Sequence, residues 1–423
     1  MGIWLLVPEH LRLGTWDLLK GWCRSTNESL APRLAMQLIN ESALCVRGIR
    51  RKRTLSQKGF EVANGLPFIA TDYAIHELLN NQPISNTMMM QTALGKIRKT
   101  FGHFKGRLLT IDPHRIITAS KRQMIRRKNN KEDNRPSKMA QTFFCLDSDT
   151  SQPVCFSTGT SARSVTQATP ELVSTASEIL GRSSEKSLVM ADCEHYTMDL
   201  FDWFREESFF DFIAPMPNTP SLKQLIQSIP DTEFIRHWAG YATTQRPYTL
   251  RNASKESKYH HYQHIQRKGE RKDEYEFKSF LCTQDRDEVE DLSLNYPERW
   301  NIESFFKNYQ ALGWDRVNTM NLNIQFGRMT MALFAQAASY MMRQKIGSPY
   351  DNWDSDHLAN DFFRGLEGDI RVSNDTIIVT YYNAMILEKH KSYYQHMPQI
   401  LQSEGINPEI PWLFNFKIDF KFK

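Results

Sequence analysis

Cysteine is scarce in this sequence. The 423 residues include six cysteines, and none of them belongs to a CxxC motif or to another paired spacing. Closely spaced cysteines mark structural zinc sites and disulfide frameworks, so the sequence argues against both. The cysteine usage fits a reducing compartment, and we therefore expect a cytoplasmic protein.

Long apolar runs, internal repeats and a strong charge imbalance are also missing. No run approaches the ~20 apolar residues that a membrane-spanning helix needs, so we expect no membrane partner. The stretch Met1–Pro8 is apolar, but it is short and has no basic leader, which argues against a signal peptide. The formal net charge of +5 permits a polyanionic partner without requiring one.

Basic residues are instead concentrated in two local clusters. The first lies within residues 47–58 and contains no acid, and the second lies within residues 121–138, where Glu132 and Asp133 are outnumbered. We expect the second cluster to loop out, because it is polar and contains proline. Such clusters are commonly solvated surface, but clustered cations also bind DNA phosphates by releasing counterions.

Helical periodicity dominates residues 1–100. Apolar residues recur at helical intervals in Glu9–Leu19 and Leu30–Leu44, and further helices are expected in Thr71–Asn81 and Ser85–Phe101. We therefore expect a helical N-terminal domain that binds DNA, although no clear helix-turn-helix signature is visible.

Two buried strands are expected to end in a carboxylate. The apolar run Leu108–Ile111 is followed by Asp112 and by Pro113, which should halt the strand. The run Ser187–Ala191 repeats this pattern and is followed by Asp192. An Asp before proline can also simply cap a turn. Right-handed crossovers favour a parallel, neighbouring placement of the two strands, so that both acids meet where α/β sheets bind ligands.

The other elements predict a mixed α/β fold. Two β-prone runs, Met139–Leu146 and Pro153–Thr158, are joined by turn residues and predict a hairpin, and a helix is expected to begin at Thr169. Residues 218–294 are expected to form a β-rich insertion. Its histidines fit a surface or DNA-facing cluster better than a zinc site: His260, His261 and His264.

The segment Tyr296–Lys307 is expected to run from a loop into a helix, because proline is tolerated in the first helical turn. Residues four apart share a helix face, so Arg299, Glu303 and Lys307 form a stripe of base, acid and base. One interpretation is an exposed helix with weak ion pairs, and the other is a carboxylate held between cations near a phosphate chain. The residues expected in the core are Trp300, Ile302, Phe305 and Phe306.

The C-terminal part adds a long apolar helix, Asn321–Ile346, and a hairpin around Ser373–Asp375. We expect a helical N-terminal domain, a catalytic core in two pieces with the insertion between them, and a C-terminal region. The corresponding ranges are 1–100, 101–217, 218–294, 295–347 and 348–423.

Three acids, Asp112, Asp192 and Glu303, therefore come from two strand ends and a later helix. Converging carboxylates repel one another and require compensating charge, most simply a divalent metal. Hard oxygen ligands select Mg²⁺ or Mn²⁺ rather than zinc. Two such ions about 3.5–4 Å apart can stabilise the attacking and leaving oxygens of a phosphodiester, and the basic clusters would hold the polyanion.

On these residues the chain resembles the DDE transposases of bacterial insertion sequences, specifically the IS4-like group, over about residues 100–380. The motifs that carry the resemblance are Leu-Thr-Ile-Asp112-Pro-His-Arg, Val-Met-Ala-Asp192-Cys-Glu-His-Tyr and Tyr296-Pro-Glu-Arg299-Trp-Asn-Ile-Glu303. The group's signature is Tyr, two residues, Arg, three residues, Glu, six residues, Lys. The first three positions match, whereas Gln310 stands at the last and Lys307 is the nearest cation.

The resemblance implies a ribonuclease-H-like mixed sheet flanked by helices, and a bacterial, nucleoid-associated enzyme. It further implies that two Mg²⁺ ions, replaceable by Mn²⁺, support cleavage at the transposon end and attack by the freed 3′-hydroxyl. Tyr296, Arg299 and Lys307 would contact the DNA, and Trp300 would stack on an unpaired base, although core packing is the more expected role for Trp300. A homodimer would join two double-stranded DNA ends, with the insertion near the cleavage site.

Other functions remain open. A decayed or repurposed DNA-binding protein would keep the fold without the chemistry, and Gln310 favours this reading slightly. A repair or restriction nuclease on the same fold would cleave without strand transfer. A non-enzymatic helical protein would hold the three carboxylates far apart.

Overall fold

The computed structural model divides into two compact units. One comprises Met1–Arg98 together with Phe306–Lys423, and the other comprises Lys99–Phe305. The finer division into five parts stays a prediction. The first basic cluster, and residues 121–124 and 130–132 of the second, lie outside the described residues. The structure describes residues 1–46, 59–118, 125–129, 133–160, 162–181, 187–251, 254–314 and 321–423.

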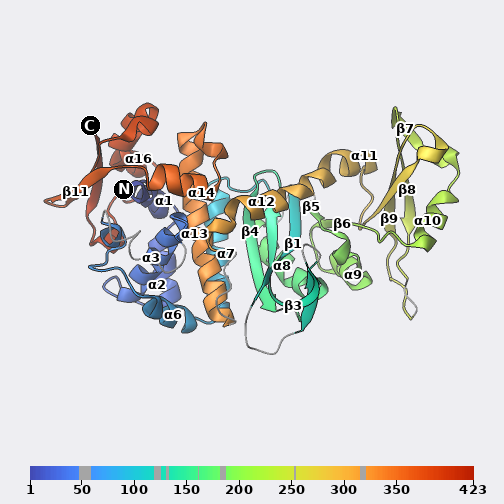
Figure 1. Cartoon of the computed structure of the whole chain (residues 1–423), viewed down its shortest axis with the longest axis horizontal. Coiled ribbons are helices and arrows are strands. Elements are labelled where there is room, and N and C mark those ends of the chain that lie inside the picture. Colours follow the sequence, from blue (N-terminus) through green and yellow to red (C-terminus); the bar gives the residue numbers. More distant parts are fainter. Residues whose placement is uncertain are drawn as a thin grey trace. The chain divides into compact units, whose positions relative to one another are not determined.

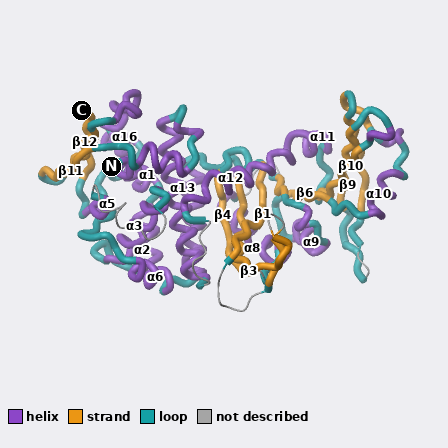
Figure 2. The backbone as a smooth tube through the Cα atoms, viewed as in Figure 1, coloured by secondary structure: helices purple, strands orange, loops and turns teal. Residues whose placement is uncertain are grey.

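The unit Lys99–Phe305 is built on one mixed sheet flanked by helices (Figures 1 and 2). The strand order is β2-β3-β1-β5-β6-β10-β9-β8-β7, with β4 paired to β3. Strand β3 is antiparallel to β1, whereas β5 is parallel to β1 and β6 is parallel to β5. The predicted hairpin (β3 and β4) and the predicted parallel pair (β1 and β5) are confirmed. The strands are β1 Leu108–Ile117, β2 Arg126–Asn129, β3 Asp133–Asp147, β4 Gln152–Thr160, β5 Leu188–Met190, β6 Asp211–Pro215, β7 Ile235–Trp238, β8 Tyr241–Tyr248, β9 His261–Lys268 and β10 Glu276–Cys282.

Strand β1 continues past Asp112 to Ile117, so the expectation that Pro113 halts it is wrong. Pro113 stands opposite Phe143 of β3. Pairing with β5, in contrast, ends at Thr110. Beyond that point β5 no longer requires an amide hydrogen from β1, and proline is tolerated in a strand where no neighbour needs its N–H. Parts of the second basic cluster, expected to loop out, belong to β2 and β3.

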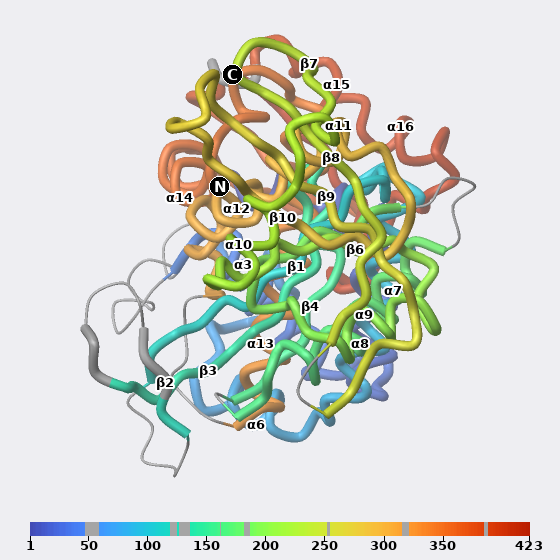
Figure 3. Tube along the Cα trace, turned by 90° about the vertical axis from the view of Figure 1, so that its right-hand side faces the viewer, coloured from blue at the N-terminus to red at the C-terminus, as the bar shows by residue number. Residues whose placement is uncertain are grey.

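Residues 218–294 contribute four strands that continue the same sheet. Strand β10 is antiparallel to β6, with Phe280 opposite Pro215, and β9, β8 and β7 follow outward in that order (Figure 3). The insertion is therefore β-rich, as predicted, and its innermost strand borders the parallel part of the sheet.

Helix α8 begins at Val165 rather than at Thr169. Ser164 caps it, because its hydroxyl accepts a hydrogen bond from the amide of Gln167 while the Gln167 side chain accepts one from the amide of Ser164. This reciprocal capping box satisfies two amides at the helix start and overrides the cap expected at Thr169. The helices of this unit are α8 Val165–Leu180, α9 Met198–Glu206, α10 Pro220–Gln227 and α11 Glu288–Glu290; α12 Asn301–Tyr309 starts in it.

The two faces of the sheet carry different cores. Successive strand residues point to opposite faces. Leu109 and Ile111 of β1 join a cluster with residues of α8 and α9. Leu108 joins the opposite cluster, together with Leu188 and Met190 of β5. The second face is the one that carries the acids described below.

The other unit is mainly helical and is centred on α13 (Leu322–Ile346), most of whose residues are buried. The predicted long helix and the predicted hairpin (β11 and β12) are confirmed. The helix expected over Glu9–Leu19 is broken at Gly14, which has a φ of 58°. No helix in the described ranges is both long and apolar enough to cross a membrane. The main elements are α1 Val7–Arg12, α2 Thr15–Cys23, α3 Leu30–Ala43, α5 Phe60–Ala63, α6 Asp72–Asn80, α7 Ile84–Thr100, α14 Ser355–His357, β11 Gly368–Ser373, β12 Thr376–Tyr381, α15 Lys391–Gln395, α16 Met397–Ser403 and β13 Lys417–Phe422.

Candidate active site

Asp112 and Asp192 occupy matching positions on neighbouring strands. In the parallel pair β1–β5, Thr110 stands opposite Met190. Each acid follows its strand's last paired residue by two positions, so each shares a face with that residue. Met190 belongs to the core on the second face, and both carboxylates therefore lie on that face. Neighbouring strands are about 4.8 Å apart, which brings the two acids close together.

Glu303 is carried by α12, which packs against the sheet through its apolar side. Ile302 and Phe305 are buried, and the Phe305 ring lies edge-on to Phe144 of β3 at 5.7 Å between centroids. The Asn301 amide also donates a hydrogen bond to the carbonyl of Ser148 at 3.0 Å. Phe144 stands opposite Asp112 in the β1–β3 register, so α12 covers the face on which Asp112 lies.

The three acids and Arg299 act on one another through their charges. The pKa of Asp112 is raised to about 7, first by burial and then by the charge of Asp192, with a smaller contribution from Glu303. Arg299 opposes this rise. The same guanidinium lies 3.6 Å from the Glu303 carboxylate, which confirms the predicted stripe at this pair. Asp112, Asp192 and Glu303 thus share one electrostatic environment with Arg299 as a common counter-charge.

The pKa of Asp192 is shifted in the opposite direction, downwards. Burial would raise its pKa, but hydrogen bonding and charge from His195, the amide of Glu194 and the charge of Arg299 together hold the pKa below its ordinary value. The Nδ1 atom of His195 is 2.7 Å from Asp192 Oδ1, and the Glu194 amide donates to the same oxygen at 3.0 Å. The surroundings therefore favour the ionised form of Asp192 and disfavour the ionised form of Asp112 in the same site.

A second layer of residues, which sequence reasoning missed, supports the acids. Arg115 makes a two-pronged contact with the Glu194 carboxylate at 2.6 and 2.5 Å and donates to Gln141 at 2.9 Å. This pair links β1 to the 3₁₀ turn after β5 (Cys193–His195). The signal was present, because Arg115, Glu194 and His195 stand within the two motifs that contain the acids.

Tyr296 is half-buried against the core of the second face. Its hydroxyl donates to the carbonyl of Ala191 at 3.0 Å, and its ring lies edge-on to Phe280 at 4.7 Å. Burial raises its pKa well above the ordinary value. Tyr296 therefore holds the signature segment to the residue preceding Asp192. Its contact with DNA stays a prediction.

Trp300 does not pack in the core, and that expectation is wrong. The side chain is 60% exposed, and Arg299 lies 6.0 Å from its ring centroid. Residues Tyr296–Trp300 form a 3₁₀ turn before α12 begins. Three residues per turn, rather than 3.6, rotate Trp300 away from the apolar stripe of α12. Lys307 and Gln310 are exposed.

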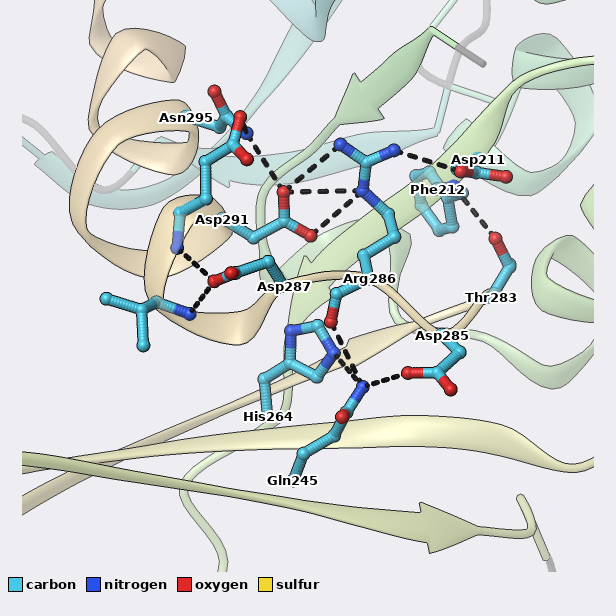
Figure 4. A network of polar contacts seen from close by, with 12 residues as sticks. Asp211, Phe212, Gln245, His264, Thr283, Asp285, Arg286, Asp287, Asp291 and Asn295 are labelled. Carbon is cyan, nitrogen blue, oxygen red and sulfur yellow. Dashed lines mark hydrogen bonds and ion pairs between the residues drawn. The ribbon is translucent and has the colours of Figure 1, made fainter. Parts of the chain in front are cut away.

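A buried polar network anchors the segment that leads to Tyr296 (Figure 4). Arg286, which follows β10, contacts Asp211 of β6 at 3.0 Å and Asp291 at 3.0 Å. Asp291 accepts a further hydrogen bond from Asn295 at 3.0 Å, and Asn295 accepts one from Arg107 at 3.2 Å. The chain between the insertion and α12 is thereby tied to the sheet at both strand β6 and the start of strand β1.

The fold and the site define an α/β protein with a cluster of acids on one sheet face. The chain matches the family model described as "Transposase DDE domain" over residues 103–337, more than half of its length, so it belongs to the DDE transposase family. It is also similar, at 11% identity and a TM-score of 0.34, to the solved structure "Cryo-EM structure of piggyBac transposase synaptic complex with hairpin DNA", covering 81% of this chain and 73% of the other. No curated protein matches the sequence.

Membership of this family implies an enzyme of DNA transposition with DNA as a partner, and the mixed sheet with its helices is consistent with a ribonuclease-H-like transposase fold. All three acids lie within the matched region.

DDE transposases generally use divalent metal ions. The donor set fits such ions, because carboxylate oxygens are hard ligands, and burial together with the charges of Asp192 and Glu303 disfavours the ionised form of Asp112 in the absence of a cation. In the described part of the chain no three Asp, Glu, His or Cys side chains are arranged to hold a metal. Asp112, Asp192 and Glu303 therefore stay predicted ligands.

Proposed function

We propose that this chain is the transposase of a bacterial IS4-like insertion sequence, which cuts DNA at the ends of the element and joins the freed 3′-hydroxyl to another phosphodiester. The observation that carries the proposal is the electrostatic coupling of Asp112 to both Asp192 and Glu303, three acids from separate parts of the chain. The family match over residues 103–337 supports it.

The proposed site works through carboxylates that are short of positive charge. Two Mg²⁺ ions, or Mn²⁺ in their place, would be held by Asp112, Asp192 and Glu303 and would supply Lewis-acid activation of the attacking oxygen. Asp192 is already ionised and ready to accept a cation. Asp112 would lose its proton more readily beside a bound cation, because burial and the neighbouring negative charges are what raise its pKa to about 7.

The remaining signature residues position DNA in this proposal. Arg299 partly offsets the acids and can contact a phosphate near the cut, and Lys307 adds an exposed cation one turn after Glu303. Tyr296 holds the signature segment to the residue before Asp192, and in this proposal it would contact a phosphate near the same cut. A homodimer holding two double-stranded DNA ends, in the bacterial cytoplasm at the nucleoid, belongs to the same proposal.

The decisive experiment is cleavage of the DNA that flanks the coding frame. A fragment carrying the terminal inverted repeats is incubated with the chain in Mg²⁺ or in EDTA, and nicking and strand transfer are followed on denaturing gels. We expect Mg²⁺-dependent nicking by the wild type and none by Asp192→Ala. The matched control is Asp202→Ala, another acid beside a histidine, which should still nick.

Each other outcome has a distinct meaning. Equal nicking by wild type and Asp192→Ala contradicts the site. Binding of the repeats without nicking by either protein supports a DNA-binding protein that has lost its chemistry, as Gln310 in place of the signature lysine would suggest. Nicking without strand transfer supports a nuclease.

Trp300 is expected to stack on an unpaired base. Because its ring is exposed beside Arg299, we predict that Trp300→Ala weakens binding to a DNA end with one unpaired base by about 1–3 kcal/mol, whereas Trp300→Phe retains most of the affinity. Fluorescence anisotropy measures both. Leu294→Ala removes another exposed apolar side chain from the preceding segment and should leave affinity unchanged. Equal losses for the alanine variants at 294 and 300 would show that general surface contact is responsible.

A further inference from the structure

One oxygen of Asp192 is fully occupied by the protein. Oδ1 is 2.7 Å from His195 Nδ1 and accepts a hydrogen bond from the Glu194 amide at 3.0 Å. A carboxylate oxygen offers two lone pairs, so these two contacts use the hydrogen-bonding capacity of Oδ1. The Asp192 side chain is nevertheless 37% accessible, whereas that of His195 is 2% accessible. Both of these contacts are to Oδ1, which leaves Oδ2 as the oxygen that can take a further ligand.

The geometry also identifies the donor and the acceptor in the contact between His195 and Asp192. A carboxylate oxygen accepts hydrogen bonds, and Oδ1 already accepts one from the Glu194 amide. The 2.7 Å contact is then a hydrogen bond that His195 Nδ1 donates to Oδ1. Neither partner can exchange roles without breaking the contact, which holds the carboxylate in one orientation.

His195 itself is held in place by its surroundings. Its backbone amide donates to the Asp192 carbonyl at 3.1 Å, and its carbonyl accepts from the Thr197 amide at 2.8 Å. The neighbouring Glu194 is fixed by the two-pronged contact with Arg115 from β1. Both donors to Oδ1 thus belong to a short turn that Arg115 ties to β1.

From these contacts we propose that His195 is a positioning residue that orients Asp192 so that Oδ2 receives the divalent cation. This rests on the proposed function, because it assumes that Asp192 is a metal ligand. Hydrogen bonds to a ligating carboxylate fix its direction, and losing such a partner typically weakens metal binding by roughly 10–100-fold. A histidine that only stabilised the turn would affect folding and leave cation affinity alone.

The test measures Mn²⁺ binding by the full chain, using the electron paramagnetic resonance signal of free Mn²⁺. We expect His195→Leu, which removes the donor but keeps similar bulk, to bind Mn²⁺ at least tenfold more weakly than the wild type. We expect His195→Asn to stay within about threefold, because the asparagine amide can place a donor where Nδ1 lies. His261→Leu is the matched control: a buried histidine at 3.8 Å from Asp202, whose ring contacts Phe201 in the core of the opposite sheet face.

The outcomes separate this inference from the proposed function. Mn²⁺ binding that is lost in Asp192→Asn but unchanged in His195→Leu overturns the positioning role and leaves the function standing. Binding by the wild type that is equal in Asp192→Asn contradicts the proposed function itself. Circular dichroism establishes that each variant is folded. Where His195→Leu fails to fold, His195→Ala takes its place with the same tenfold expectation.

Discussion

Asp112→Asn is expected to abolish DNA cleavage and, in the absence of divalent ions, to make the protein more stable at pH 8. Loss of a group from a catalytic set that acts as a unit costs on the order of 10³-fold or more in rate. The gain in stability follows from the buried position of Asp112 beside Asp192 and Glu303, which raises its pKa to about 7.

The sign of the stability change follows from proton linkage. The folded protein protonates Asp112 with a pKa of about 7, whereas the unfolded chain does so near the ordinary value of 3.8. Between these values the folded state binds the extra proton, so this residue makes stability fall as pH rises from about 4 to about 7. At pH 8 the full penalty is present. It amounts to at most about 4 kcal/mol, and we expect about half, because Asp112 keeps some exposure.

Asp192→Asn is expected to make the protein less stable at pH 8. The pKa of Asp192 is lowered in the folded state, so its ionised form contributes stability above the unfolded pKa, and this contribution is lost as pH falls through the lower folded value. Asparagine still accepts the hydrogen bonds from His195 and Glu194 but lacks the charge, so we expect a loss of about 1 kcal/mol at pH 8.

Urea unfolding in EDTA at pH 5 and at pH 8 checks both substitutions. The stabilisation by Asp112→Asn should shrink markedly at pH 5, where the wild-type carboxyl carries its proton. Asp231→Asn serves as the control, because this exposed acid pairs with Arg267 and Lys272 outside the site. If the substitutions at 112 and 192 shift stability in the same direction, the two acids do not share the environment described here.

The positions of the two aspartates could be predicted because the signals are local. Each follows a short apolar run, and crossover handedness alone favours a parallel, neighbouring pair, which the register of Thr110 with Met190 confirms. The extension of β1 past Pro113 could not be foreseen, because it depends on how far β5 extends beside it.

Two other features depend on structure that no local pattern reveals. Trp300 was placed on a continuous helix, but the 3₁₀ turn before α12 changes the rotation per residue and exposes the ring. The contacts of Arg115 with Glu194 and of His195 with Asp192 were missed, although these residues stand within the two motifs that contain the acids. The sequence predicted that the two strands are neighbours, but which side chains meet depends on the 3₁₀ turn Cys193–His195 after β5.

Arg286→Met is expected to cause the largest loss of stability, about 3–5 kcal/mol. Arg286 bridges Asp211 and Asp291, whose side chains are only 5% and 1% exposed. Burial would lower the pKa of the guanidinium, but these two acids raise it above its ordinary value. Removing the arginine takes away the positive charge that these two buried carboxylates share, and breaking a buried ion pair in this way is costly.

The cause of that loss can be separated from simple loss of packing. Neutralising both acids in the same protein, with Asp211→Asn and Asp291→Asn added to Arg286→Met, should recover most of the lost stability, because a buried charge rather than a missing contact is responsible. Arg251→Met removes an exposed pair with Glu256 and should cost less than about 1 kcal/mol in the same urea titration.

Because Asp291 also accepts a hydrogen bond from Asn295 in the segment leading to Tyr296, Arg286→Met should lower cleavage even where the protein remains folded. Full cleavage by a folded Arg286→Met protein would show that Tyr296 and Glu303 are placed by α12 packing alone.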